Sequence, residues 1–211
     1  MYLFSRVVTL QGPPADTMAW AMEVTEHVNS KISVPTSCWV SVFGRPIGTF
    51  SWSSILESHA QLAELGGQLA ADNKYHSLLA KAEDWTVTPG EDSLRSIVSG
   101  MPTEGTPPGI GASATVNTGV MAPGHFAEAL AWSVEVASYV TELTGTPVLF
   151  LTDQYGAFGG VSWISVAADV ATVDAGAAKL AGDMGFASRI DAAADFFVTG
   201  SVNAALLSRI A

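Results

Sequence analysis

Residues 19–28 read Ala-Trp-Ala-Met-Glu-Val-Thr-Glu-His-Val, and residues 131–140 repeat the pattern as Ala-Trp-Ser-Val-Glu-Val-Ala-Ser-Tyr-Val. The similarity extends in both directions, with a shift of 112 over positions 12–48 and of 111 over positions 50–89. It comprises 22 identities in 77 aligned positions, whereas this composition would give about six by chance. The chain is therefore a tandem duplication.

The two copies are separated by a segment of distinct composition. Residues 99–112 contain four Gly and three Pro, which sustain neither a helix nor a central strand. We therefore expect a ferredoxin-like repeat over 1–98, a Gly/Pro linker over 99–112 and a second ferredoxin-like repeat over 113–211.

The sequence pattern of the first copy predicts the element order β-α-β-β-α-β, which is typical of a split βαβ unit. Its first helix carries apolar residues at four-residue spacing, which forms one buried stripe. A carboxylate at position 72, repeated at position 183, is expected to cap a new helical turn. The expected elements are a strand over 2–11, a helix ending at Pro35, strands over 36–43 and 48–55, a helical stretch over 58–83 and a strand over 85–88.

This arrangement resembles the dimeric α/β-barrel superfamily. Within it, Trp52, the run Leu69-Ala70-Ala71-Asp72 and Tyr75 resemble the NIPSNAP-like group, and the second copy repeats them as Trp163, Leu180-Ala181-Gly182-Asp183 and Phe186. The resemblance implies an α+β fold, in which the antiparallel sheets of the two units pack as an intrachain pseudo-dimeric α/β barrel with the helices outside. In relatives, ligands often lie in a cleft between helices and sheet, but the superfamily hosts many activities, so the fold does not give the function.

Composition excludes several classes of partner. Apolar residues make up 48% of the chain and charged residues 14%, enough to bury a large core. With 9 Lys+Arg against 20 Asp+Glu, the net charge of -11 disfavours nucleic acid and anionic membranes. A single cysteine excludes an internal disulfide framework and a multi-cysteine metal site, and we expect no bound metal. No leader or spanning segment is visible, so a cytoplasmic protein is expected.

Candidate catalytic residues are Glu23, His27 and His76. Glu23 lies beside the apolar stripe of the first helix, where partial burial would suit general acid–base work. His27 follows it by four residues, and His76 follows Asp72 by four. The alternative is that each of these side chains is a packing or surface residue.

The tryptophans are the candidate ligand-binding residues. Trp20, Trp52 and Trp39 could line an aromatic pocket in the first unit. Trp20 and Trp52 recur at the same places in the second unit, and matched bulky residues also suit a core role.

Three hypotheses follow for function, and the sequence leaves open whether the chain is an enzyme. The first is that it binds or transforms a small, uncharged, mostly apolar molecule in a helix–sheet cleft of the first unit. The second is a non-catalytic assembly module, including a homo-oligomer, that packs through the apolar stretch 161–173. The third, a haem-binding barrel, rests on analogy with the superfamily and would need a histidine facing the cleft.

Overall fold

The structure is a computed structural model that describes residues 1–101 and 108–211. Its first half contains β1 (Tyr2–Thr9), α1 (Pro14–Lys31), β2 (Ser37–Phe43), β3 (Thr49–Leu56), α2 (His59–Ala70), α3 (Asn73–Lys81), the short 3-10 helix η1 (Glu83–Trp85) and β4 (Glu91–Ser99). Its second half contains β5 (Ser113–Val120), α4 (Phe126–Thr144), β6 (Val148–Asp153), β7 (Gly160–Ala167), α5 (Val170–Gly182), α6 (Met184–Ala192) and β8 (Asn203–Arg209).

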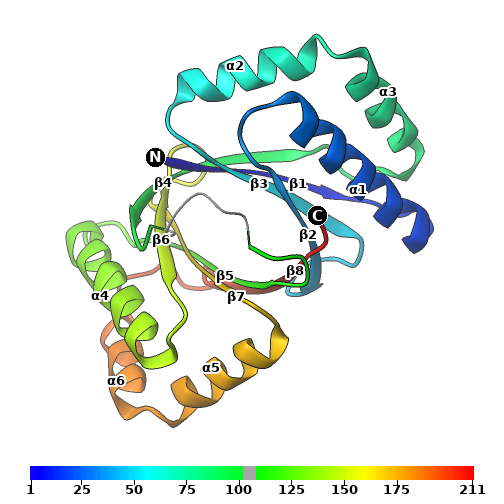
Figure 1. The fold of residues 1–211 in the computed structure, drawn as a ribbon. Coiled ribbons are helices and arrows are strands. Elements are labelled where there is room, and N and C mark those ends of the chain that lie inside the picture. The colour runs from blue at the N-terminus through cyan, green and yellow to red at the C-terminus, as the bar shows by residue number, and fades with distance from the viewer. Residues whose placement is uncertain (102–107) are drawn as a thin grey trace.

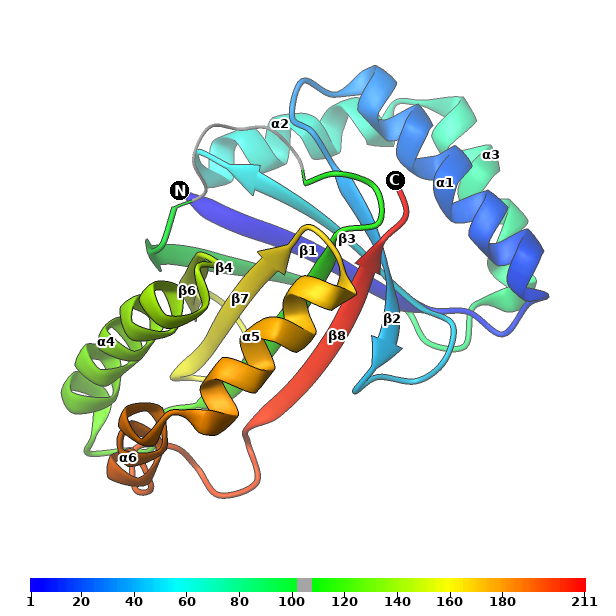
Figure 2. The ribbon, with the colours of Figure 1, turned by 60° about the horizontal axis from the view of Figure 1, so that its bottom comes forward.

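The eight strands form one closed antiparallel barrel, in the order β1-β3-β2-β8-β5-β7-β6-β4. Each half contributes four strands, and the halves join where β2 pairs with β8 and β4 pairs with β6. The helices lie outside, those of the first half against one side of the barrel and those of the second half against the other (Figures 1 and 2). The predicted α+β pseudo-dimeric barrel is confirmed.

Alternation along the strands divides the side chains between two environments. Outward-facing Phe50 and Trp52 pack under α1 and α3 with Leu78, and Phe150 packs with Trp163 under the helices of the second half. Because the barrel is closed, each of the eight strands has a hydrogen-bonded neighbour on both sides and the sheet has no free edge strand.

The predicted fourth strand over 85–88 is reduced to a single antiparallel bridge between Thr86 and Leu10. The backbone N–H groups of Trp85 and Thr86 bond back to the carbonyl of Ala82, so the pairing with the end of β1 stays short. Pro89 then removes a backbone donor, and the strand forms only from Glu91, where polar and apolar residues alternate.

Two other expectations concern the linker over 99–112 and the apolar assembly stretch over 161–173. The predicted linker 99–112 includes residues 102–107, which lie outside the described residues. The stretch 161–173 is not a free assembly surface at its start, because β7 pairs with β5 on one side and β6 on the other. None of the described helices is sufficiently long and apolar to span a bilayer.

Candidate functional site

Glu23 and His27 lie at the contact between α1 and α3. The Glu23 carboxylate accepts hydrogen bonds from Lys81 at 2.9 Å and Lys74 at 3.1 Å, and its side chain is 43% exposed. These two ammonium groups lower the pKa of Glu23 below its usual value. His27 donates from Nε2 to Oδ1 of Asp72 at 3.1 Å. The two predicted catalytic residues therefore hold one helix against another.

Asp72 is the centre of this helix contact. It caps the N-terminus of α3, where its Oδ1 accepts from the backbone N–H of Tyr75 at 2.8 Å, and Lys31 Nζ lies 3.2 Å from its Oδ2. The Tyr75 N–H, then His27 and Lys31, hold the pKa of Asp72 well below its usual range, against the opposing effect of partial burial. The predicted cap is confirmed.

The second half repeats this contact with other side chains. Asp183 caps α6 and accepts from the Tyr139 hydroxyl at 2.7 Å, so Tyr139 takes the place of His27. Arg189 pairs with Glu135 at 2.7 Å and stacks over the Tyr139 ring. Replacement of His27 by Tyr139 between the copies thus preserves one structural interaction, a donor to the capping aspartate.

An Asp72→Asn variant tests the electrostatic part of this contact. Because the folded-state pKa of Asp72 lies below its unfolded value, its charge stabilises the fold above about pH 4 and the contribution is lost as the pH falls. We expect wild type to lose more stability than Asp72→Asn in urea unfolding between about pH 5 and pH 3. Asn retains the cap, and Asp191→Asn on α6 is the control. Parallel pH profiles for wild type and Asp72→Asn would contradict this role.

The remaining candidates lie in different environments. His76 is exposed on α3, with its Nε2 2.8 Å from the carbonyl oxygen of Ala70. Trp20 and Trp52 are buried in the core of the first half, where their rings meet edge to face at 5.9 Å. Trp39 faces the barrel interior and donates to Ser53. The predicted residues therefore do not gather around one cavity.

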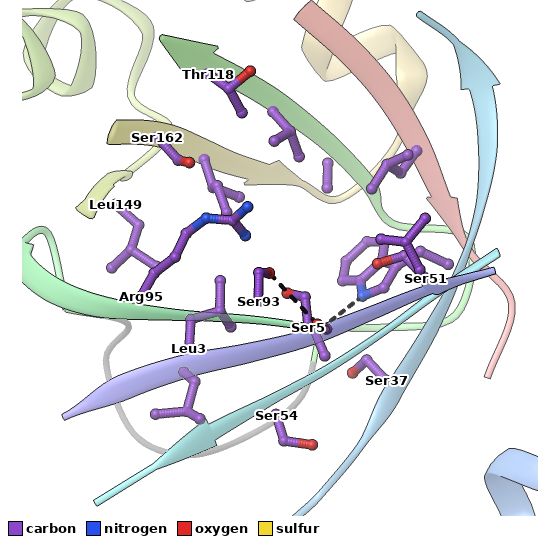
Figure 3. Close-up of a pocket in the computed structure, with 18 of the residues that line it drawn as sticks. Leu3, Ser5, Ser37, Ser51, Ser54, Ser93, Arg95, Thr118, Leu149 and Ser162 are labelled. Atoms are coloured by element: carbon purple, nitrogen blue, oxygen red, sulfur yellow. Dashed lines mark hydrogen bonds between the residues drawn. The ribbon is translucent and has the colours of Figure 1, made fainter. Parts of the chain in front are cut away.

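The barrel encloses a cavity of about 920 Å³, shown in Figure 3. Hydroxyl groups line the wall from the first half, and aliphatic side chains dominate the wall from the second. Arg95 extends from β4 into this space and donates from Nε to Asp153 Oδ1 at 2.9 Å. Arg45, on the turn between β2 and β3, also lines the cavity and is half-buried.

A separate cavity of about 640 Å³ lies between the helices and the sheet of the second half. Its floor is formed by β5 and β7, and α4, α5 and α6 surround it. Neither α5 nor α6 has a buried residue. We call this space the second-half cavity. In the first half, the core around Trp20 and Trp52 and the Leu65 cluster occupy the corresponding space between helices and sheet, and the predicted cleft there stays a prediction.

The second-half cavity arises from the loss of one cluster of side chains. In the first half, Leu65 of α2 packs with Leu56, Phe4 and Ile32 among others, beneath the helix. The repeat alignment and the strand register pair the residues of this cluster with smaller residues in the second half. Together these replacements leave about a dozen fewer heavy atoms in the space. The replacements that line the cavity are Phe4 by Thr115, Ile32 by Thr144, Val34 by Thr146, Leu56 by Ala167, Leu62 by Val173 and Leu65 by Gly176.

The second-half cavity can be predicted from the sequence, but only by comparing the volumes of equivalent residues in the two copies. Comparing the titratable residues of the copies points to the first half, where three of the four histidines lie. Comparing the sizes of paired apolar residues points to the second half, since a large residue replaced by a small one leaves a void unless the backbone closes it.

Neither cavity has a haem-iron ligand other than methionine among the described residues. Their described lining includes no His, Cys or Tyr, whereas Met1 and Met101 line the barrel cavity. His27 and His76 bond to other groups as described, His59 packs between Tyr2 and Tyr155, and His125 pairs with Glu128. Among the described residues, no three His, Cys, Asp or Glu side chains gather as a metal site.

A scan against protein-family models finds no match, and a search of curated protein sequences finds none either. Solved structures do match over the whole chain. A “putative monooxygenase” from Fusobacterium nucleatum subsp. nucleatum has a TM-score of 0.72 at 11% identity, covering 100% of this chain and 92% of its own. An “anthrone oxidase-like protein” has a TM-score of 0.68 at 13% identity, covering 100% and 91%.

A third match contains haem. A haem-bound variant of DypB from Rhodococcus jostii has a TM-score of 0.56 at 12% identity, covering 98% of this chain and 92% of its own. At these identities the matches show the fold alone. They agree with the strand order in assigning the dimeric α/β-barrel fold to this chain.

Proposed function

We propose that this chain, a dimeric α/β barrel by fold, binds a small, uncharged and largely apolar molecule in the second-half cavity. One observation carries the proposal: no Asp, Glu, Lys, Arg or His occurs among the described residues that line the cavity. A charged ligand would lose its hydration there without gaining a counter-charge, which is costly. Apolar ligands lose no comparable hydration, and burial favours them.

The aromatic side chains of the cavity favour a ligand with a flat ring system. Trp132, Trp163, Phe186 and Phe197 all contribute to the lining. Both indole N–H groups already donate to backbone carbonyls of the protein, Trp132 to Arg189 and Trp163 to Ser133. These bonds fix the rings in place, so they present apolar faces and edges to a ligand.

One polar group on the floor suits an oriented contact. Asn117 projects from β5 into the lining, and its side-chain amide makes no hydrogen bond to another described residue. An amide can donate and accept, so a carbonyl or hydroxyl on an otherwise apolar ligand would complete its bonding. A few such groups in an apolar pocket are typical of small-molecule sites.

The proposal concerns binding and does not include a reaction. The cavity offers no side chain, among the described residues, that titrates near neutral pH for general acid–base catalysis. A catalytic role for Glu23, His27 and His76 stays a prediction, and none of the three lines this cavity. Two of the matched structures, a “putative monooxygenase” and an “anthrone oxidase-like protein”, support a small molecule as the ligand class.

A fluorescence titration with Nile red, an uncharged apolar dye, tests the proposal. We expect one saturable site with a blue-shifted emission. Its affinity should stay within about twofold between pH 6 and pH 8, because no described lining side chain titrates there. Native mass spectrometry of the purified protein supplies the stoichiometry. Absence of saturable binding, or an affinity that follows a histidine titration, would contradict the proposal.

A further inference from the structure

We propose that the interior of the barrel is a second binding site, which takes a monocarboxylate with an apolar body. This site lies inside the ring of strands, whereas the second-half cavity lies outside it, between sheet and helices. Its volume of about 920 Å³ falls within the range of small-molecule sites. Charged groups, hydroxyls and an apolar wall meet in this one space.

The first observation is an incompletely bonded guanidinium. Arg95 uses Nε to bind Asp153, and the two side chains are 17% and 21% exposed. Its terminal amino groups make no hydrogen bond to another described residue, and Figure 3 shows them pointing into the cavity. A guanidinium presents five N–H donors in a planar fork, so most of this group is available to a ligand oxygen.

The second observation is an excess of positive charge among the half-buried groups of the lining. Arg45 lines the same space, is half-buried and forms no ion pair with a described residue. Burial and the neighbouring Arg95 lower the pKa of Arg45, with Glu91 opposing them. Glu91 and Glu57, the other acidic residues of the lining, are exposed. The half-buried groups, two arginines against Asp153, therefore sum to one positive charge, which one carboxylate would neutralise.

The third observation is a buried hydroxyl without a partner. Ser162 of β7 is 1% exposed and lines the cavity, and its Oγ has no hydrogen bond in the described structure. A buried polar group left unpaired costs free energy. By contrast, Ser53 accepts from Trp39 and Ser93 donates to the backbone of Ser5. A ligand oxygen would satisfy this hydroxyl once the side chains that shield the Oγ shift aside.

The opposite wall indicates the body of the ligand. Aliphatic residues of the lining face the interior, and several come from the second half. The strand register places Leu207 where the first half has Arg95, because Ala114 pairs with Leu207 as Leu3 pairs with Arg95. The duplicated barrel thus has a charged side and an apolar side, which matches an amphiphile. Four aliphatic lining residues lie on β5, β7 and β8, across the barrel from Arg95: Val116, Ile164, Val166 and Leu207.

Calorimetric titration with decanoate and with its uncharged analogue decanamide tests the inference. We expect decanoate to bind about tenfold or more tightly than decanamide, because charge-assisted hydrogen bonds to arginine strengthen only the carboxylate complex. Arg45→Gln should weaken decanoate about tenfold and leave decanamide unchanged. Arg6→Gln, which removes the same charge from the outer face of β1, should leave decanoate affinity within about twofold.

Two further variants separate this site from folding and from the second-half cavity. Ser162→Ala removes only the unpartnered hydroxyl, so the fold should persist while decanoate binds about three- to tenfold more weakly. Gly176→Leu, in the second-half cavity, should not change decanoate affinity. Equal binding of decanoate and decanamide, or an Arg45→Gln and Ser162→Ala pair that both bind as wild type, would overturn the inference. Loss of decanoate binding in Gly176→Leu would place it in the other cavity and also overturn it.

Discussion

A Gly176→Leu variant is expected to lose most of its affinity for Nile red, by about tenfold to a hundredfold, while becoming more stable. Leucine is the residue that the first half has at this position, where Leu65 is 6% exposed. A Cβ built on Gly176 would meet Thr144 at 3.6 Å, an ordinary contact, so the helix accepts a side chain there. The leucine would then extend into the space that the ligand occupies.

The gain in stability has two sources. Replacing glycine inside a helix contributes about 0.5–1 kcal/mol, and burying a leucine side chain adds about 1.5–3 kcal/mol when the burial is complete. Gly67→Leu in α2 is the matched control, because nothing lies within 4 Å of a Cβ at Gly67. This control should gain only the helical contribution and keep its affinity for Nile red.

The two readouts together make the test specific. Urea unfolding measures stability, and a dye titration measures affinity on the same preparations. If Gly176→Leu binds Nile red as tightly as wild type, the ligand does not lie in the second-half cavity. If Gly67→Leu also loses affinity, the effect of Gly176→Leu is indirect.

A Leu78→Ala variant is expected to lose about 2–5 kcal/mol of unfolding free energy, the usual cost of emptying a fully buried leucine site. Leu78 is 0% exposed and belongs to the core of the first half, and its carbonyl accepts from the Trp20 indole at 2.7 Å. The backbone bond survives the substitution, so the loss measures packing. Leu79→Ala on the same helix, at a residue that is 40% exposed, is the control and should cost less than about 1 kcal/mol.

The second half offers a comparison at the equivalent position. Arg189 replaces Leu78 there, pairing with Glu135 and stacking on Tyr139, and its side chain is 31% exposed. Exposed ion pairs and cation–π contacts contribute about 1 kcal/mol or less each. Arg189→Ala should therefore cost clearly less than Leu78→Ala. Equal losses in urea unfolding would show that the two halves are packed alike at this position and would contradict the expected difference.

Much of the architecture could be predicted from the repeat. The Trp20 and Trp132 stretches mark two copies of one helix, and a sheet with two apolar faces needs a covering partner. The capping role of Asp72 and Asp183 could also be predicted, since it depends on local spacing. The fourth strand could not, because the bonds from Trp85 and Thr86 to Ala82 and the pairing of β4 with β6 decide its start.

The candidate site was harder to predict for a physical reason. Titratable residues such as Glu23 and His27 attract attention in a sequence, but their partners on α3 come from 45 or more residues away. Those partners turn both side chains into helix contacts. The second-half cavity exists because residues there, above all Thr115 and Gly176, are smaller than their first-half equivalents Phe4 and Leu65. Such a difference is visible only when the side-chain volumes of the two copies are compared.

The most direct test of ligand binding in the second-half cavity is to locate the bound dye by methyl-resolved NMR. Nile red would be titrated into protein labelled at valine and leucine methyl groups. We expect the largest shifts at Val136, Val140 and Val173, which line the second-half cavity. Their counterparts Val24, Val28 and Leu62 in the first half should be unaffected. Shifts centred on the first-half residues, or on the barrel residues Val116 and Leu207, would contradict binding in this cavity.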